Sequence, residues 1–384
     1  MGKIANGPST HRYTSLDGLR GLAALVVLIH HCFLVSPLLT SAVNGSGDGP
    51  MHPWVWWATF TPLHLFWAGG EAVYVFFILS GFVLALPFIG NENPNWGSYF
   101  PRRIIRIYLP VWASLIFALG AAWVFPRISG PNFSPWINQH DEAPDVLSDA
   151  ILLWGAGSLN SPLWSLQWEM NFSLLLPLYV IIALRFQRVW LLGLSGLFLL
   201  IAAGEILHIS ALVCLPMFGV GVLMAVRRDL ITSFSAKVSR SGWAVVLILS
   251  TALLCSRWIF PQMPVGAATA AIGGALLLFA FIECKAAIRM GTFPTVRWLG
   301  SRSFSLYLVH EPIVVSVAFC LEETNPFTIA ALSVPLTLLV TEVFFRSVEK
   351  PSQRLARAAG NRFTGRGFTK SFSDHVGTHP TSQT

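Results

Sequence analysis

The chain has 384 residues, of which 54% are hydrophobic and only 11% are charged, and its formal net charge is +7. Soluble domains carry about 25% charged residues, so this composition excludes a chain of soluble domains and indicates a polytopic membrane protein. In such a protein the position of the positive charges matters more than their sum. The sequence contains no nucleic-acid or dinucleotide motif, and no nucleic-acid partner is expected.

Ten apolar runs approach the length of about 20 residues that a helix needs to cross a bilayer. Backbone polar groups cannot stay unpaired in lipid, so each run is predicted to be a helix. The predicted spans are residues 21–39, 66–89, 107–126, 163–184, 190–207, 209–226, 243–260, 264–282, 303–321 and 327–345. The sequence therefore predicts an all-α integral membrane protein with about ten transmembrane helices.

The connections between these runs alternate in charge. One side would hold nearly every Lys and Arg, whereas the other would hold only Arg127, with Arg257 close to a span end. By the positive-inside rule the basic side is cytoplasmic, and an even number of spans then places both termini there. Residues 1–43 have the basic start and apolar run of a signal peptide. Because the run is long, contains His30 and His31 and precedes many more spans, we expect a retained first span.

Two stretches fit no span. Residues 40–65 are rich in Gly, Pro and Trp and lack Lys and Arg, which predicts an outer loop. Residues 128–162 include a short apolar run at 146–157 that cannot cross the bilayer, and that run either lies in the outer interface or re-enters the membrane. Together the two stretches would cover an outward-facing cavity. Residues 356–384 are polar and are predicted to be a disordered cytoplasmic tail, which leaves residues 1–355 as one transmembrane domain.

The first predicted helix carries an arginine near its start and two histidines near its middle. Arg20 and His31 are eleven positions apart, so they lie within about 20° of one another around the helix and about 16 Å apart along it. His30 lies about 80° from that line. Such side chains are costly inside a membrane and usually carry function. This face suits an extended substrate with an anionic head and a reactive far end. The alternative for His31 is a hydrogen-bonded core histidine.

The same stretch, SLDGLRGLAALVVLIHH, resembles the opening helix of the membrane acyltransferase-3 family, the O-acyltransferases of cell-surface sugars. The family's motif of Arg, ten residues and His falls on Arg20 and His31. The resemblance continues in the family's order at FFILSGFVL (76–84), PRRIIRIYLPVW (101–112), SPLWSLQWEMNFSLLLPL (161–178), SRSFSLYLVHEPIV (301–314) and VEKPSQRL (348–355). These blocks cover most of the chain, so the resemblance implies a membrane-bound acyltransferase.

Three arginines stand at the cytoplasmic start of the third predicted span. Arg103 and Arg106, at positions i and i+3, share a helix face. Guanidinium groups bind phosphate through paired donors, although a simple positive-inside anchor is the alternative. The family's Arg-x-x-Arg motif falls on these two residues. The resemblance therefore implies that Arg103 and Arg106, with Arg20, bind the phosphates of an acyl-coenzyme A, for which acetyl is the family's usual acyl group.

Glu169 lies in the fourth predicted span, within WSLQWEMNF. Many members of the family have two acidic residues at this point, whereas this chain has Met170 in place of the second. We expect Glu169 to orient either His31 or the acceptor sugar. The alternative is a buried carboxylate that pairs with a neighbouring helix.

Two further candidates concern substrate binding. Trp164 and Trp168 are either platforms for a sugar ring or aromatic residues of the membrane interface. His310 precedes Glu311 and Pro312 in the ninth predicted span and matches a late histidine block of the family. Its role is either structural or to orient the substrate. The five cysteines are scattered without a CxxC pair, which predicts neither a zinc site nor a disulfide framework, and no metal site is apparent.

The resemblance predicts transfer of an acyl group from cytoplasmic acyl-CoA to a hydroxyl of a surface or exported carbohydrate, at the cytoplasmic (inner) membrane of a bacterium. His31 would be the general base or would accept the acyl group covalently, and Glu169 would be the second catalytic residue. Trp164 and His310 would bind the acceptor. A proton-coupled secondary transporter and a membrane scaffold or sensor are the rival interpretations. The oligomeric state is not predicted.

Overall fold

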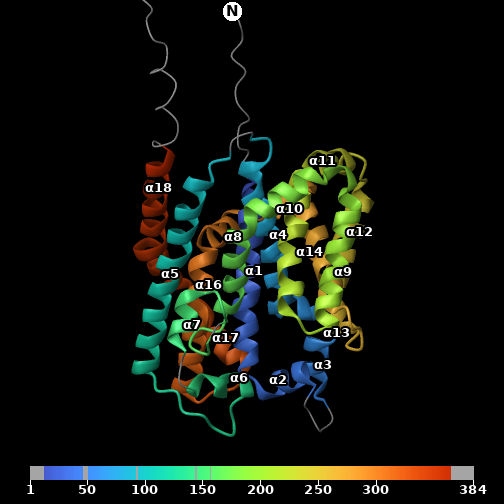
Figure 1. Cartoon of the computed structure of the whole chain (residues 1–384). Coiled ribbons are helices and arrows are strands. Elements are labelled where there is room, and N and C mark those ends of the chain that lie inside the picture. The colour runs from blue at the N-terminus through green and yellow to red at the C-terminus, as the bar shows by residue number, and fades with distance from the viewer. Residues whose placement is uncertain (1–12, 46–50, 92–93, 143–144, 156, 365–384) are drawn as a thin grey trace, which may run out of the picture.

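The computed structural model describes residues 13–45, 51–91, 94–142, 145–155 and 157–364. Within these ranges the chain forms helices and contains no strand. The long helices run side by side in one bundle (Figure 1). They are α1 (Thr14–Leu34), α4 (Gly69–Ala85), α5 (Trp96–Val124), α8 (Leu163–Arg185), α9 (Trp190–Ile206), α10 (Ser210–Val226), α12 (Arg240–Leu254), α14 (Gly266–Glu283), α16 (Pro294–Leu321) and α17 (Pro326–Phe344).

Each of the ten predicted runs overlaps one of these helices. In the described part of the chain, eight helices are long and apolar enough to cross a membrane. A ninth span results if α10 and α11 (Arg228–Ser235), which are bent by 70° at their junction, count as one. The apolar helix α12 has only 15 residues. The all-α membrane fold is confirmed, whereas the count of ten and the cytoplasmic position of both termini stay predictions.

Helix boundaries differ most from the predicted spans where polar residues or proline intervene. The helix α5 begins at Trp96, well before the predicted start at 107, because Asn95 caps it by accepting a hydrogen bond from the backbone N–H of Ser98 at 2.9 Å. Hydropathy reports only the apolar part of such a helix. Conversely, α1 ends at Leu34 rather than at 39, and Pro37 starts a new helix, α2 (Pro37–Asn44).

The predicted disordered tail is in part a helix. Residues Lys350–Thr364 form α18, which packs along α5 (Figure 1). The buried positions Ser352, Ala356 and Gly360 are four residues apart, so they form one face of small residues that the polar composition conceals. The side chain of Arg102 donates a hydrogen bond to Asn361 at 2.7 Å. The expectation of disorder is therefore wrong for residues 356–364, and residues 365–384 lie outside the described residues.

The two stretches that fit no span meet at one end of the bundle, opposite α11 and α18 (Figure 1). They contain α2, α3 (Pro53–Thr59), η1 (Pro62–Trp67), α6 (Pro135–Asn138), η3 (Gln139–Asp141) and α7 (Val146–Ile151). The hydroxyl of Ser134 donates to the backbone carbonyl of Leu34 at 2.7 Å, which joins the second stretch to the end of α1, and α6 also contacts α2. Asn160 donates to the carbonyl of Leu308, near the middle of α16, at 3.0 Å. The end of this stretch therefore lies between the helices, and the choice between an interfacial and a re-entrant run at 146–157 stays a prediction.

The helix α1 approaches its neighbours closely at two glycines. A Cβ atom at Gly18 would overlap the backbone of Gly291, the last residue of α15 (Lys285–Gly291), and a Cβ atom at Gly21 would overlap the backbone of Gly300 in α16. Small residues at such crossings let helix backbones pack directly against one another. The position of α1 against α15 and α16 is therefore held at backbone distance.

Candidate active site

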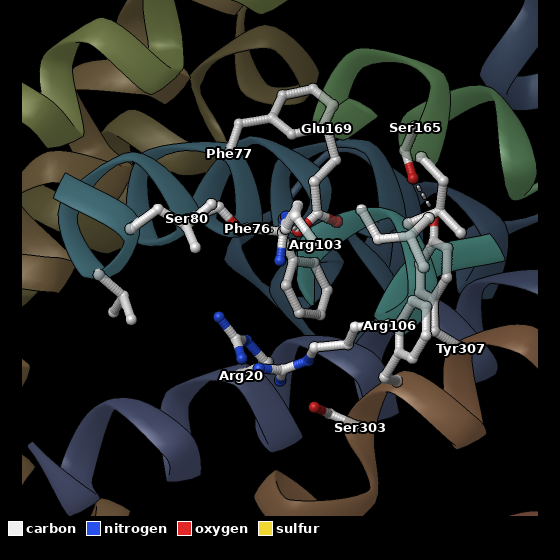
Figure 2. Close-up of a pocket in the computed structure, with 15 residues that line it drawn as sticks. Arg20, Phe76, Phe77, Ser80, Arg103, Arg106, Ser165, Glu169, Ser303 and Tyr307 are labelled. Carbon is white, nitrogen blue, oxygen red and sulfur yellow. Dashed lines mark hydrogen bonds and ion pairs between the residues drawn. The ribbon is translucent and has the colours of Figure 1, made fainter. Parts of the chain in front are cut away.

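A cavity of about 100 Å³ lies among α1, α4, α5, α8 and α16, and three arginine side chains line it. Arg20 comes from α1, and Arg103 and Arg106 come from α5 (Figure 2). Arg103 forms an ion pair with Glu169 and donates a second hydrogen bond to the hydroxyl of Ser173 at 2.9 Å. Among the described residues, no carboxylate lies within ion-pair distance of Arg20 or Arg106. Three guanidinium groups thus share one carboxylate, which gives this arginine cavity an excess of positive charge.

An aromatic residue closes one wall of the arginine cavity. The hydroxyl of Tyr307 forms a hydrogen bond with Ser165 at 2.7 Å and donates to the carbonyl of Pro162 at 3.1 Å. The Tyr307 ring packs edge-on against Phe76, with 5.9 Å between centroids, and its centroid lies 5.6 Å from that of His310. Tyr307 therefore separates the arginine cavity from the histidines beyond it.

His31 and His310 form a buried pair behind Tyr307, with ring centroids 4.8 Å apart. The Nδ1 atom of His31 lies 2.8 Å from the carbonyl of Val27, and Nδ1 of His310 lies 2.8 Å from the carbonyl of Tyr307. A carbonyl can only accept, so both Nδ1 atoms are assigned as N–H donors. The single Nδ1–H of His31 is then shared between the Val27 carbonyl and Nε2 of His310, which lies 3.2 Å from Nδ1 and accepts the weaker part of a three-centre hydrogen bond. This leaves Nε2 of His31 with a lone pair and with no hydrogen-bond partner among the described residues.

Residues 136–140, in α6 and η3, form a clamp that covers the histidine pair on its other side. The Trp136 ring lies 5.4 Å from the ring of His31. Two residues of the chain, His140 and Ser161, donate to the same carboxylate oxygen of Glu311, at 2.8 and 2.7 Å. The side chains of His140 and Glu311 are fully buried. The contact between His140 and Glu311 therefore fixes Trp136 over the neutral imidazole of His31.

Comparison with known proteins agrees with this arrangement. Residues 13–346, most of the chain, match the model of a family described as an acyltransferase domain. The chain belongs to the acyltransferase-3 family. Family membership and the apolar helices together identify it as a multi-pass membrane protein of the acyltransferase class.

The chain is similar in sequence to three described acyltransferases. It is 23% identical over 384 residues to the peptidoglycan O-acetyltransferase OatA of Listeria monocytogenes. This alignment covers 88% of the present chain and 56% of OatA. It is 24% identical over 403 residues to YrhL of Bacillus subtilis, with 89% and 55% covered. It is 26% identical over 348 residues to the acyltransferase MdmB of Streptomyces mycarofaciens, with 80% of each covered. The chain thus spans about half the length of the first two relatives. No solved structure matches it significantly.

Two sequence blocks of the family meet near the middle of α16. Glu349, in VEKPSQRL, accepts hydrogen bonds from the backbone N–H of Ser305 at 3.1 Å and from its hydroxyl at 2.5 Å. Ser305 lies two residues before Tyr307 and belongs to the block SRSFSLYLVHEPIV. The C-terminal block therefore anchors the helix that carries both Tyr307 and His310.

The structure brings most of the predicted site residues together. Arg20, Arg103 and Arg106 share the arginine cavity, and His31 contacts His310. Glu169, however, pairs with Arg103 of α5 and makes no contact with His31 among the described hydrogen bonds, which agrees with the alternative of a carboxylate that pairs with a neighbouring helix. Its carboxylate serves as the counter-ion of the arginines.

Trp164, predicted either to bind the acceptor or to lie at the membrane interface, stands apart from these residues. Its side chain faces a different and larger cavity, and its ring packs against Phe77, which lines the arginine cavity. Trp164 therefore does not contact the histidine pair. Sequence reasoning also missed Tyr307, Ser165 and the His140 clamp. The motif HEP drew attention to Glu311, but no spacing in the sequence relates it to His140, which lies 171 residues earlier.

Proposed function

We propose that this protein transfers an acyl group, in the simplest case acetyl, from a cytoplasmic acyl-CoA to a hydroxyl of a surface or exported carbohydrate. The observation that carries the proposal is that the arginine cavity and the histidine pair lie along the same two helices. Arg20 and His31 are both on α1, and Ser303, Tyr307 and His310 are on α16. A donor whose anionic group is held by the arginines would thus direct its reactive end toward His31.

The donor would bind through its phosphates. Within the described part of the chain, Arg20 and Arg106 are the two guanidinium groups of this cavity that have no carboxylate at ion-pair distance. Phosphate oxygens accept paired hydrogen bonds from guanidinium groups. A cavity of about 100 Å³ cannot hold a whole coenzyme A, so the nucleotide stays at the mouth while the thin pantetheine arm enters. Because Tyr307 stands between the cavity and the histidines, its ring has to turn aside before the thioester reaches His31.

The chemical step follows from the assigned tautomers. Nε2 of His31 takes the proton of the acceptor hydroxyl while the oxygen attacks the thioester carbonyl. The carbon–sulfur bond then breaks, and the same imidazole returns the proton to the departing thiolate, which leaves as the free thiol. The hydrogen bonds of Nδ1 to Val27 and His310 hold the ring during both transfers. An acyl-histidine formed at Nε2 would give the same products.

The acceptor and the location rest on the relatives. OatA is named a peptidoglycan O-acetyltransferase and YrhL a "Putative peptidoglycan O-acetyltransferase", which supports a carbohydrate hydroxyl as the acceptor class. A bacterial cytoplasmic membrane places acyl-CoA on one side and such glycans on the other, and the protein would join the two.

Purified protein in lipid nanodiscs, incubated with radiolabelled acetyl-CoA and soluble glycan fragments, tests the proposal. We expect label on the glycan in the native protein and none in His31→Ala. Mass spectrometry of surface glycans from cells with and without the protein should show the matching acetyl groups. Proton-driven uptake of a solute into vesicles without consumption of the thioester would instead support the transporter.

A further inference from the structure

A second cavity, of about 820 Å³, lies between α4, α8, the turn from α9 to α10 and the start of α14. Its lining includes residues of that turn, Arg257 of α13 (Ser256–Ile259) and Pro264. The turn and α13 lie toward the end of the bundle that carries α2 and α3 (Figure 1). This is the outer end in the topology that the charges predict. Its volume falls within the usual range for small-molecule sites, about 300–1,000 Å³.

One turn of α8 forms the wall between the two cavities. Trp164 and Trp168, one helical turn apart, face the larger cavity, whereas Ser165 and Glu169 face the arginine cavity. The Trp164 ring packs edge-on against Phe77 of α4, with 6.2 Å between centroids. A single layer of side chains therefore separates the larger cavity from the donor site.

The neighbouring residues Phe76 and Phe77 place all three sites around one point of α4. Both line the arginine cavity, where Phe76 packs against Tyr307 beside the histidine pair and Phe77 packs against Trp164 beside the larger cavity. The donor cavity, the histidines and the larger cavity thus meet at adjacent residues.

The lining of the larger cavity combines aromatic rings with polar groups that can still form hydrogen bonds to a ligand. Tyr74, Trp164 and Trp168 supply the rings. The hydroxyl of Tyr74 and the guanidinium of Arg257 line the cavity and have no hydrogen-bond partner among the described residues. Glu205 uses one oxygen to accept from the backbone N–H of Ala267 at 2.7 Å and has a second oxygen available. Aromatic faces pack on the C–H faces of sugar rings, and such polar groups bind their hydroxyls.

A lipid is the other occupant to weigh. A cavity of similar size, about 890 Å³, lies between α5, α16 and α17, and its side chains are almost all apolar, as an acyl chain requires. The cavity beside α8 differs because Glu205, Arg257 and Gln167 line it together with the rings. Its chemistry therefore matches a polyhydroxylated ligand rather than a hydrocarbon chain.

We propose that the cavity beside α8 binds a carbohydrate, namely the acceptor glycan, with Trp164 and Trp168 as platforms for its rings. The inference rests on the proposed function for the identity of this ligand as the acceptor. Donor and acceptor would then enter from opposite ends of the bundle and meet where Phe76 and Phe77 separate them. Movement of Phe77 and Trp164 would admit the acceptor hydroxyl to the site of transfer.

Saturation-transfer-difference NMR on the full chain in nanodiscs tests this binding without any acyl donor. The probes are an N-acetylglucosamine tetrasaccharide and maltotetraose. We expect at least one to bind the native protein, to bind Trp168→Ala at least about tenfold more weakly and to bind Trp168→Phe nearly normally, since an aromatic face remains. Trp154, an exposed tryptophan of the loop before α8 that does not line the cavity, provides the control, and Trp154→Ala should bind like the native protein.

A second variant guards against loss of folding in Trp168→Ala. Glu205→Gln keeps an oxygen for the N–H of Ala267 and removes the charge, so we expect a normal melting temperature and weaker glycan binding. Glycan binding without acyl transfer would overturn the proposed function and leave the site standing. Three outcomes would each overturn the site. They are no binding of either probe, an unchanged affinity in both variants, and a co-purified lipid that contacts Trp168.

Discussion

The two ends of the α1–α16 pair treat polar side chains in opposite ways. At the arginine cavity, charged groups outnumber their counter-ions and face open space. At the histidine pair, the rings are buried, held by backbone carbonyls and covered by Trp136. Unpaired charge inside a membrane protein is costly unless a ligand supplies the counter-charge. The comparison indicates that the arginine end is built to receive an anion and the histidine end to hold a neutral base.

The largest effect should come from the base itself. His31→Ala removes the only imidazole nitrogen of the pair that is free to take a proton, so acyl transfer should fall on the order of 10²–10⁴-fold. Binding of acetyl-CoA, measured by calorimetry, should remain because the arginines are intact. His30→Ala is the control, since Nδ1 of His30 contacts the carbonyl of Trp67 rather than His310. An inactive His30→Ala with an active His31→Ala would refute the assignment.

The next effect concerns the open arginine end. Arg106→Ala removes an unpaired guanidinium, and a hydrogen bond to a charged group contributes about 1.5–3 kcal/mol, so the Kd for acetyl-CoA should rise roughly 10- to 100-fold. Arg106→Lys should restore only part of this affinity, because the paired donor geometry is lost. Titration calorimetry with acetyl-CoA measures both. Unchanged affinity in Arg106→Ala would leave Arg106 as a topological anchor.

Glu169→Gln sharpens the same comparison. If Glu169 is only the counter-ion of Arg103, the amide retains a hydrogen-bond acceptor while Arg103 becomes free for the anion. Affinity for acetyl-CoA should then stay equal or increase, and transfer should persist. A loss of transfer on the order of 10²-fold with donor binding intact would show instead that Glu169 takes part in the chemistry.

The clamp at the histidine end should affect stability before it affects the donor. His140→Ala leaves the buried carboxylate of Glu311 without its histidine partner, and breaking such a pair costs about 3–5 kcal/mol. We expect a lower melting temperature and faster hydrogen exchange in residues 135–141, with acetyl-CoA affinity unchanged. His52→Ala, an exposed histidine at the same end of the bundle, should show neither change. Slow exchange in His140→Ala would mean that other contacts hold the clamp.

The smallest effect concerns a carboxyl group of the α7 stretch. Burial raises the pKa of Asp149 to about 6, although its Oδ1 accepts a hydrogen bond from the N–H of Gly157 at 2.6 Å. The folded state thus binds this proton more tightly than the unfolded state, so the free energy of unfolding should fall as the pH rises from about 4 to about 6. Asp149→Asn keeps the acceptor and should remove this slope. Melting temperatures between pH 4 and 7 for both proteins provide the measurement, and parallel curves would contradict it.

The sequence predicts best what lies within one helix. The apolar runs mark the helices because lipid demands paired backbone groups, and the Arg20–His31 face follows from helical geometry alone. The pairing of Arg103 with Arg106 likewise needs no tertiary information. In each case the spacing along the chain determines the geometry.

Contacts between distant segments could not be predicted in this way. The partner of Glu169 depends on how far α8 lies along α5, and the partner of Glu311 on how deeply the α7 stretch descends. Composition also concealed α18, whose small residues pack against α5 while its charged residues face outward. These features arise from packing, which no periodicity of a single segment reports.

The close packing of two glycines of α1 would limit the length of donor that the proposed site accepts. With Gly18 and Gly21 pressed against the backbones of Gly291 and Gly300, α1 cannot slide or rotate without a clash. A helix also cannot stretch, so the separation of Arg20 from His31 stays at about 16 Å along the axis. The helix therefore keeps the distance between the two side chains constant. If the proposed donor binds, this separation would select it by the length between its anionic group and its thioester, and one residue inserted between positions 20 and 31 would turn His31 about 100° away.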